Sequence, residues 1–238
     1  MTAAHIGIAA AETPTTGDAS LRREGRADAL PSQKLGYRFV KRAFDIAFSS
    51  VVVVVGFVPG LVLSGFVAKD TGGSPIYAQE RIGKDGKPFR IYKFRTMVAD
   101  ADDVEKYLSA EQLEEWKRER KVEDDPRITK LGGFLRRTSL DEIPQFLNVV
   151  AGQMSVVGPR PITSDELTHF GSDAAKLLSR RPGITGWWQT QSRNDASFET
   201  GERQALELYY IDHASLGLDV RIAASTVGSM FGSGKKGR

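Results

Sequence analysis

The hydropathy pattern is dominated by one long apolar run near the N-terminal end of the chain. Between Asp45 and Lys69, the stretch IAFSSVVVVVGFVPGLVLSGFVA has 23 residues and no charge, and an α-helix needs roughly 20 to span a bilayer. The five consecutive valines would also suit a buried strand, but strands rarely exceed about ten residues. The run therefore predicts a helix embedded in a membrane.

Two details of this run argue against a simple crossing. Pro59 lies near its middle, between Gly56 and Gly60, and a proline inside a helix removes a backbone donor and kinks or breaks the helix. Basic residues flank the run on both sides, whereas a spanning helix usually has its basic bias on one side. We therefore expect residues 35–70 to form a helical hairpin, broken at Pro59, that enters and leaves the bilayer by one face. A single span is the alternative.

The rest of the pattern predicts a small α/β domain, mostly helical, over residues 71–231. The alternation in PFRIYKFRTM predicts a strand that follows a turn at GKDGK. Residues 98–121 are highly charged and have helical spacing, as does the chain after about Ser197. Residues 1–34 and 232–238 have little apolar periodicity, and we expect both to be disordered tails.

Composition excludes several kinds of chemistry. The chain has no cysteine, so disulfides, thiolate catalysis and cysteine-ligated zinc sites are ruled out. Its three histidines are far apart in the sequence, which argues against a histidine metal site or a Ser-His-Asp triad. The formal net charge is only +3, and the cations are not interleaved with stacking aromatics. Nucleic acid is therefore not expected as a partner.

Residues 137–148, RTSLDEIPQFLN, contain two adjacent carboxylates, Asp141 and Glu142. A structural interpretation is that Ser139 and Glu142 form an S-x-x-E capping box at a helix start. Pro144 would then be the fifth helical residue, which disfavours that register. The alternative is a helix that begins near Pro144, with both carboxylates in its lead-in. In either case we expect the helix N-terminus to keep a carboxylate there ionised.

Several cations accompany this pair. Lys93 and Arg95 share one face of the predicted strand, Arg160 is held between two prolines, and Arg136 and Arg193 lie near the carboxylates or downstream. One interpretation is a network of salt bridges. The other is a site for a diphosphate, in which arginines bind the phosphates and a carboxylate holds Mg²⁺ or attacks phosphorus.

Four segments together resemble a known family. KRAFD, ERIGKDGKPFRIYKFRTM, DDPRITKLGGFLRRTSLDEIPQFLNVVAGQMSVVGPRP and RRPGITGWWQTQSRND are similar, in this order, to the bacterial sugar transferases, over about residues 37–231. These are monotopic polyprenyl-phosphate hexose-1-phosphate transferases, and the short form resembles the exopolysaccharide galactosyl or glucosyl phosphotransferases. The resemblance implies transfer from a UDP-hexose to a polyprenyl (undecaprenyl) phosphate. It also implies inner-membrane lipid as a partner and the cytoplasmic face of the bacterial inner membrane as the location.

The same resemblance implies roles for individual residues. Asp141 would bind Mg²⁺ and attack the sugar-linked phosphorus, giving a covalent phosphosugar intermediate while UMP leaves, with Glu142 as its partner. Pro59 would break a re-entrant membrane helix. Contacts to the substrate phosphates would come from five cations: Lys93, Arg95, Arg136, Arg160 and Arg193. The rival hypotheses are a lipid-linked glycosyltransferase, which would release UDP, and a non-enzymatic membrane scaffold. A homodimer is left open by the sequence.

Overall fold

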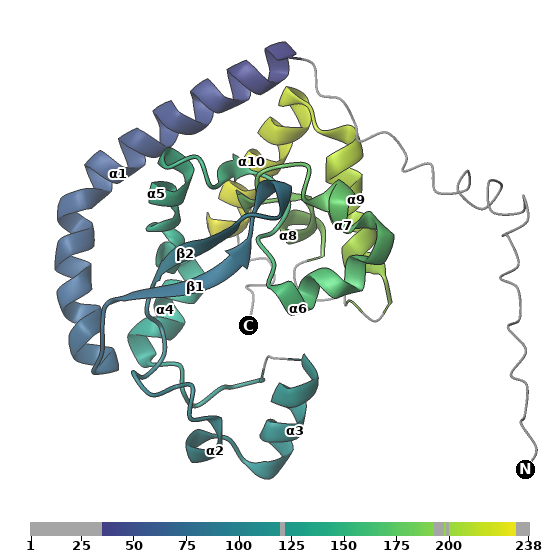
Figure 1. Ribbon diagram of the computed structural model, residues 1–238. Coiled ribbons are helices and arrows are strands. Elements are labelled where there is room, and N and C mark those ends of the chain that lie inside the picture. Colours follow the sequence, from purple (N-terminus) through teal and green to yellow (C-terminus); the bar gives the residue numbers. More distant parts are fainter. Residues whose placement is uncertain (1–34, 120–121, 193–197, 199, 232–238) are drawn as a thin grey trace, which may run out of the picture. The chain divides into compact units, whose positions relative to one another are not determined.

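The computed structural model describes residues 35–119, 122–192, 198 and 200–231, so both predicted tails lie outside the described residues (Figure 1). The described chain is mostly helical, with two small sheets. The helices are α1 Leu35–Thr71, α2 Val104–Tyr107, α3 Ala110–Glu119, α4 Lys130–Thr138, α5 Gln145–Val150, α6 Ser164–Leu167, α7 Ala174–Leu177, α8 Trp187–Gln191, α9 Glu202–His213 and α10 Leu216–Phe231. The strands are β1 Ile76–Ile82, β2 Pro88–Phe94, β3 Ser155–Val157 and β4 Gly183–Thr185, and 3₁₀ turns lie at η1 Lys84–Gly86, η2 Leu140–Glu142 and η3 Thr168–Asp173.

The apolar run lies within α1, which is a single helix with Pro59 in its interior. The run is therefore not divided into two separate helices, and Figure 1 shows α1 as one helix that bends along its length. A proline removes only one backbone donor, so the turns on either side can continue the helix. Among the described residues, α1 is the one helix long and apolar enough to cross a membrane. Most of its large hydrophobic side chains are exposed.

Polar side chains attach the N-terminal half of α1 to the rest of the domain. Tyr37, Lys41 and Asp45 follow one another at intervals of four residues, so they share one face of the helix. The carboxylate of Asp45 accepts hydrogen bonds from the backbone N–H of Val156 (3.1 Å) and the hydroxyl of Ser155 (2.7 Å). The carboxylate of Asp219 in α10 accepts a hydrogen bond from the Tyr37 hydroxyl at 2.8 Å and pairs with the Lys41 ammonium at 3.1 Å.

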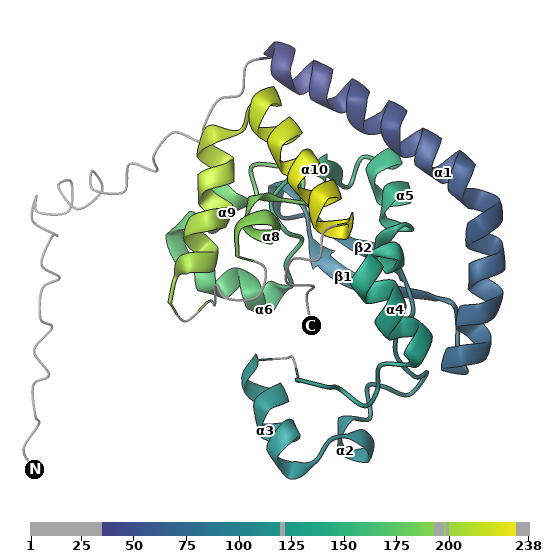
Figure 2. The same cartoon turned by 180° about the vertical axis from the view of Figure 1, so that it is seen from behind.

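The C-terminal half of α1 is attached by apolar packing. Its buried Val67 forms a cluster with Phe94 of β2 and Leu135 of α4, and Leu63 packs against this cluster. Both views of the molecule show α5 lying alongside α1 (Figures 1 and 2). The membrane-type helix is thus in contact with the same domain near both of its ends.

The predicted strand and turn are confirmed. β2 pairs with β1 in an antiparallel hairpin, in which Arg81 faces Phe89. The turn between them uses positive φ at Asp85 (58°) and Gly86 (75°), as the GKDGK sequence indicated. The second sheet is a short parallel pair, β3 with β4. At Gly183 in β4, an added Cβ would lie 2.1 Å from the backbone nitrogen of Gly158, just after β3. Only glycine therefore fits at this position.

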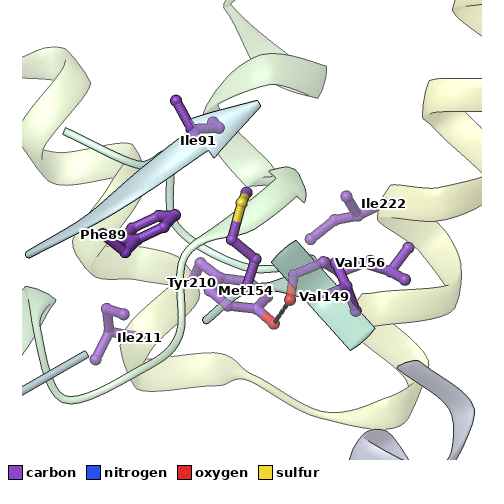
Figure 3. Packing of buried hydrophobic residues seen from close by; sticks show 9 residues of the cluster. Phe89, Ile91, Val149, Met154, Val156, Tyr210, Ile211 and Ile222 are labelled. Carbon is purple, nitrogen blue, oxygen red and sulfur yellow. Dashed lines mark hydrogen bonds between the residues drawn. The ribbon is translucent and has the colours of Figure 1, made fainter. Parts of the chain in front are cut away.

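The main hydrophobic core joins β2 and β3 to the two C-terminal helices. Figure 3 shows Phe89 and Ile91 of β2 near Met154, Tyr210 and Ile222. The hydroxyl of the buried Tyr210 donates to the carboxylate of Asp219 at 2.7 Å and lies 3.3 Å from the β3 carbonyl of Val157, so its polar end is satisfied.

The two predicted helical regions are confirmed in part. Within residues 98–119 the chain forms the short helices α2 and α3, and Leu108 between them is buried. The chain after Ser197 forms α9 and α10. In α10, Ile222 is buried in the core, whereas Val220 and Val227 are exposed.

Candidate functional site

The two adjacent carboxylates lie in the turn η2, between α4 and α5. Ser139 has a left-handed backbone (φ 56°) and ends α4, because its N–H donates back to carbonyls of that helix. Its side chain caps no helix, so the predicted capping box is wrong. The alternative is confirmed: Pro144 immediately precedes α5, and Asp141 and Glu142 lie in its lead-in.

Apolar neighbours fix this turn against α1. Leu140 and Ile143, on either side of the carboxylates, pack on the cluster that contains Val67 of α1. A Cβ on Gly56 of α1 would meet the Ile143 side chain at 3.9 Å. The carboxylate pair therefore lies directly beside the exposed apolar helix.

Burial dominates the electrostatics of Asp141. The residue is 8% exposed, and this burial, together with the neighbouring charge of Glu142, raises its pKa from 3.8 to about 6. Lys93 and Arg136 act in the opposite direction and lower the pKa. Burial outweighs the charges that favour ionisation, so the pKa is raised. A carboxyl group with a pKa of about 6 is still mostly ionised at neutral pH, as we expected for this position.

Glu142 is paired with a cation from the neighbouring strand. The ammonium of Lys93, on β2, lies 2.8 Å from a carboxylate oxygen of Glu142. Lys93 and Glu142 both line a pocket. Its other polar lining residues are Arg81 of β1, Gln145 of α5, Gln189 of α8 and Arg160, which follows β3. The sequence analysis did not select Arg81, Gln145 or Gln189. The signal for Arg81 was the cation density of ERIGK, just before the strand that carries Lys93.

Arg160 is held in the pocket from two directions. Its backbone N–H donates to both oxygens of Glu207, at 3.3 and 3.2 Å, and its guanidinium lies 5.3 Å from the Trp188 ring centroid. Glu207 is 1% exposed, and burial raises its pKa to about 7. Arg203 lies over the same indole at 4.5 Å. The sequence analysis missed Glu207 because nothing nearby in the chain marks it as buried.

The other predicted cations have different surroundings. The Nε–H of Arg136 donates to the hydroxyl of Thr96 at 2.8 Å. Arg95 donates to the carbonyl of Ser74, also at 2.8 Å, and is not among the pocket-lining residues. Arg193 lies outside the described residues. The structure thus brings Lys93 and Arg160 together with the carboxylate pair, and Arg136 is close enough to influence Asp141 by its charge.

The predicted magnesium ion fits these residues only as an ion shared with substrate. Among the residues that the structure describes, no three His, Cys, Asp or Glu side chains cluster as a metal site. Mg²⁺ is usually held by one or two protein carboxylates, and waters and substrate phosphates complete its coordination. Asp141 and Glu142 could supply those carboxylates.

Comparisons with known proteins identify the family of this chain. The family model described as bacterial sugar transferase matches residues 36–233, from α1 through α10. A UDP-galactose-lipid carrier transferase of Erwinia amylovora is 42% identical over 194 residues, which cover 80% of this chain and 40% of that protein. An undecaprenyl-phosphate galactose phosphotransferase of Salmonella typhimurium is 42% identical over 196 residues, 81% of this chain and 40% of that protein. The exopolysaccharide production protein ExoY of Rhizobium meliloti is 42% identical over 190 residues, 79% of this chain and 83% of that protein. The chain thus spans about two fifths of the length of the first two relatives, and it belongs to the bacterial sugar transferase family.

Proposed function

We propose that this protein transfers hexose-1-phosphate from a UDP-hexose to a polyprenyl phosphate, in the first membrane step of bacterial polysaccharide synthesis. The observation that carries this proposal is the position of Asp141. It is a buried carboxylate with a pKa of about 6, next to a pocket that contains Lys93 and Arg160 and beside an apolar helix. Relatives named for sugar-phosphate transfer to a lipid carrier support the choice of substrates.

The reaction needs two displacements at one phosphorus. A carboxylate oxygen of Asp141 attacks the sugar-linked phosphorus, the bond to the bridging oxygen of the diphosphate breaks, and UMP leaves. An oxygen of the polyprenyl phosphate then attacks the same phosphorus and releases the carboxylate. Two such steps through a covalent intermediate replace one difficult transfer between a soluble and a lipid substrate.

The remaining residues stabilise charge around this phosphorus. Arg160 and Lys93 offer cationic groups to the phosphate oxygens, and Lys93 also holds Glu142 in place at 2.8 Å. Mg²⁺, bound by Asp141 and Glu142, would neutralise part of the charge of the diphosphate. Arg136 favours the ionised form of Asp141, which is the nucleophilic form.

We also propose that α1 enters and leaves the inner membrane by its cytoplasmic face. A straight spanning helix would place its ends on opposite sides of a hydrocarbon core about 30 Å thick. In this structure Asp45, near one end, and Val67, near the other, both contact the catalytic domain. Because the chain has no native cysteine, Gly36→Cys and Asp70→Cys provide single labelling sites. Both should react with a membrane-impermeant reagent from the same side, and reaction from opposite sides would contradict this topology.

Identification of the nucleotide product tests the reaction. We expect the protein in membranes to release UMP from at least one member of a panel of UDP-sugars when polyprenyl phosphate is present. Asp141→Asn should abolish this release without loss of membrane binding, and the exposed Asp173→Asn should not change it. Release of UDP would identify a lipid-linked glycosyltransferase instead. No nucleotide release with any donor would favour the scaffold.

A further inference from the structure

Two buried amide side chains lie three residues apart on α5, and they differ in one respect. Asn148, which is 0% exposed, accepts a hydrogen bond from the N–H of Tyr92 (3.1 Å) and donates to the carbonyl of Arg90 (2.7 Å) and the side chain of Gln153 (2.8 Å). Gln145 is 2% exposed, yet its amide makes no hydrogen bond to any residue that the structure describes. The Gln145 amide is therefore left to water or to a ligand, and which of the two it serves requires an explanation that Asn148 does not.

The pocket beside the carboxylate pair supplies that explanation. The side chain of Gln145 lines this pocket together with Lys93, Glu142 and Arg160. The sealed side-chain atoms that lack any partner do not include its amide, so the amide reaches accessible space, and the pocket is the accessible space that Gln145 lines. A bound ligand would therefore provide the missing hydrogen bonds.

The chemistry of an amide indicates which part of the substrate it contacts. A glutamine side chain carries no charge and offers two N–H donors and one carbonyl acceptor, which suits a hydroxyl group. The phosphates are better matched by the charged groups of Lys93 and Arg160. Gln145 also follows the nucleophile Asp141 by only four residues. The hexose is bonded to the phosphate that Asp141 attacks, whereas the base of the nucleotide is separated from it by a second phosphate and the ribose.

We propose that Gln145 binds a hydroxyl group of the hexose that is transferred. This inference rests on the proposed function, because it takes a UDP-hexose as the donor. The amide would hold the sugar while its phosphate is attacked, and it would distinguish a hexose from an analogue that lacks the contacted hydroxyl.

The variant Gln145→Met keeps a similar shape and removes the hydrogen-bonding groups. No hydrogen bond within the described protein is lost, so the unfolding temperature should not fall. In contrast, Asn148→Leu should lower the unfolding temperature, because it leaves backbone partners of this side chain unpaired. The kcat/KM for the UDP-hexose should fall by about 10- to 100-fold in Gln145→Met, as expected for a lost substrate hydrogen bond.

Monodeoxy donors give the decisive readout. UDP-galactose and UDP-glucose are tested first, and monodeoxy derivatives of the better donor are then compared in UMP-release assays. For one derivative, the wild-type protein should show a kcat/KM about 10- to 100-fold lower than for the parent hexose, and this ratio should approach one in Gln145→Met. The exposed Gln191→Met should keep the wild-type ratio.

The results separate this inference from the function on which it rests. If the wild-type protein releases UMP but Gln145→Met retains full discrimination among the deoxy donors, the inference alone is overturned. The inference is also overturned if Gln145→Met no longer prefers UDP-sugars over other nucleoside diphosphate sugars but discriminates among the hexoses as the wild type does. Gln145 would then contact the base. If the wild-type protein releases no UMP from any donor, the proposed function and this inference both fail.

Discussion

Replacement of the nucleophile should make the protein more stable near neutral pH. In the folded protein Asp141 has its pKa raised from 3.8 to about 6 by burial and by the adjacent Glu142. Ionisation of this carboxyl group is therefore harder in the folded state than in the unfolded chain. Asp141→Asn removes the group that must ionise and keeps nearly the same shape.

The sign and size of the effect follow from the two pKa values. Because the folded-state pKa is raised, the contribution of the carboxyl group to stability is complete below about pH 3.8 and is lost as the pH rises through about 6. Each pKa unit corresponds to 1.36 kcal/mol, so the loss above both values is about 3 kcal/mol. For a chain of this size that corresponds to an increase in unfolding temperature of about 6–12 °C.

Thermal unfolding in lipid nanodiscs, measured from about pH 4 to about pH 8, provides the test. Asp141→Asn should unfold at a higher temperature than the wild type at the upper end of this range, and the difference should shrink toward zero at the lower end. Asp173→Asn, at an exposed aspartate, should show no such difference. Equal or lower stability of Asp141→Asn at about pH 8 would refute the argument that burial of this carboxylate is costly.

Three further predictions concern the site and its supports. The rate of UMP release should rise with pH through about 6, as Asp141 ionises. In Glu142→Gln this rise should occur at lower pH, because the like charge that raises the pKa of Asp141 is removed. The pH profile of UMP release measures both effects. Asp45→Ala should lower stability by about 2–3 kcal/mol, since a backbone N–H and a hydroxyl lose their acceptor, whereas the exposed Asp70→Ala should leave the unfolding temperature unchanged. Gly132→Ala would place its Cβ 2.0 Å from the backbone carbonyl oxygen of Thr96. It should yield much less folded protein than Gly133→Ala, whose Cβ would meet the end of the flexible Arg137 side chain at 3.4 Å and an Ile128 methyl group at 3.9 Å.

Short-range rules predicted the local structure around the site. The alternation of apolar residues located β2, and the turn residues Asp85 and Gly86 have the positive φ that their residue types favour. The restriction that proline places on a helix interior correctly favoured a helix that begins next to Pro144, and α5 starts at Gln145. The capping-box pattern failed because Ser139 was already needed to end α4, a requirement that the S-x-x-E pattern does not contain.

Burial and long-range partners could not be predicted in this way. The acceptor of the Val156 N–H is Asp45, which lies 111 positions earlier in the chain. Glu207 and Arg160 are 47 positions apart, and a parallel pairing of β3 with β4 positions the loop between them. The raised pKa of Asp141 could not be predicted for the same reason, because the sequence shows neighbouring charges but not the packing that excludes water.

The most direct test of the central claim is the mass of the peptide that contains Asp141 after incubation with a UDP-hexose in the absence of polyprenyl phosphate. The proposed mechanism predicts an added hexose phosphate on this peptide, located at Asp141, and its loss when polyprenyl phosphate is supplied. Asp141→Asn should show no adduct. Release of UMP by the wild-type protein with no adduct on this peptide, or with an adduct on a different residue, would contradict the assignment of Asp141 as the nucleophile.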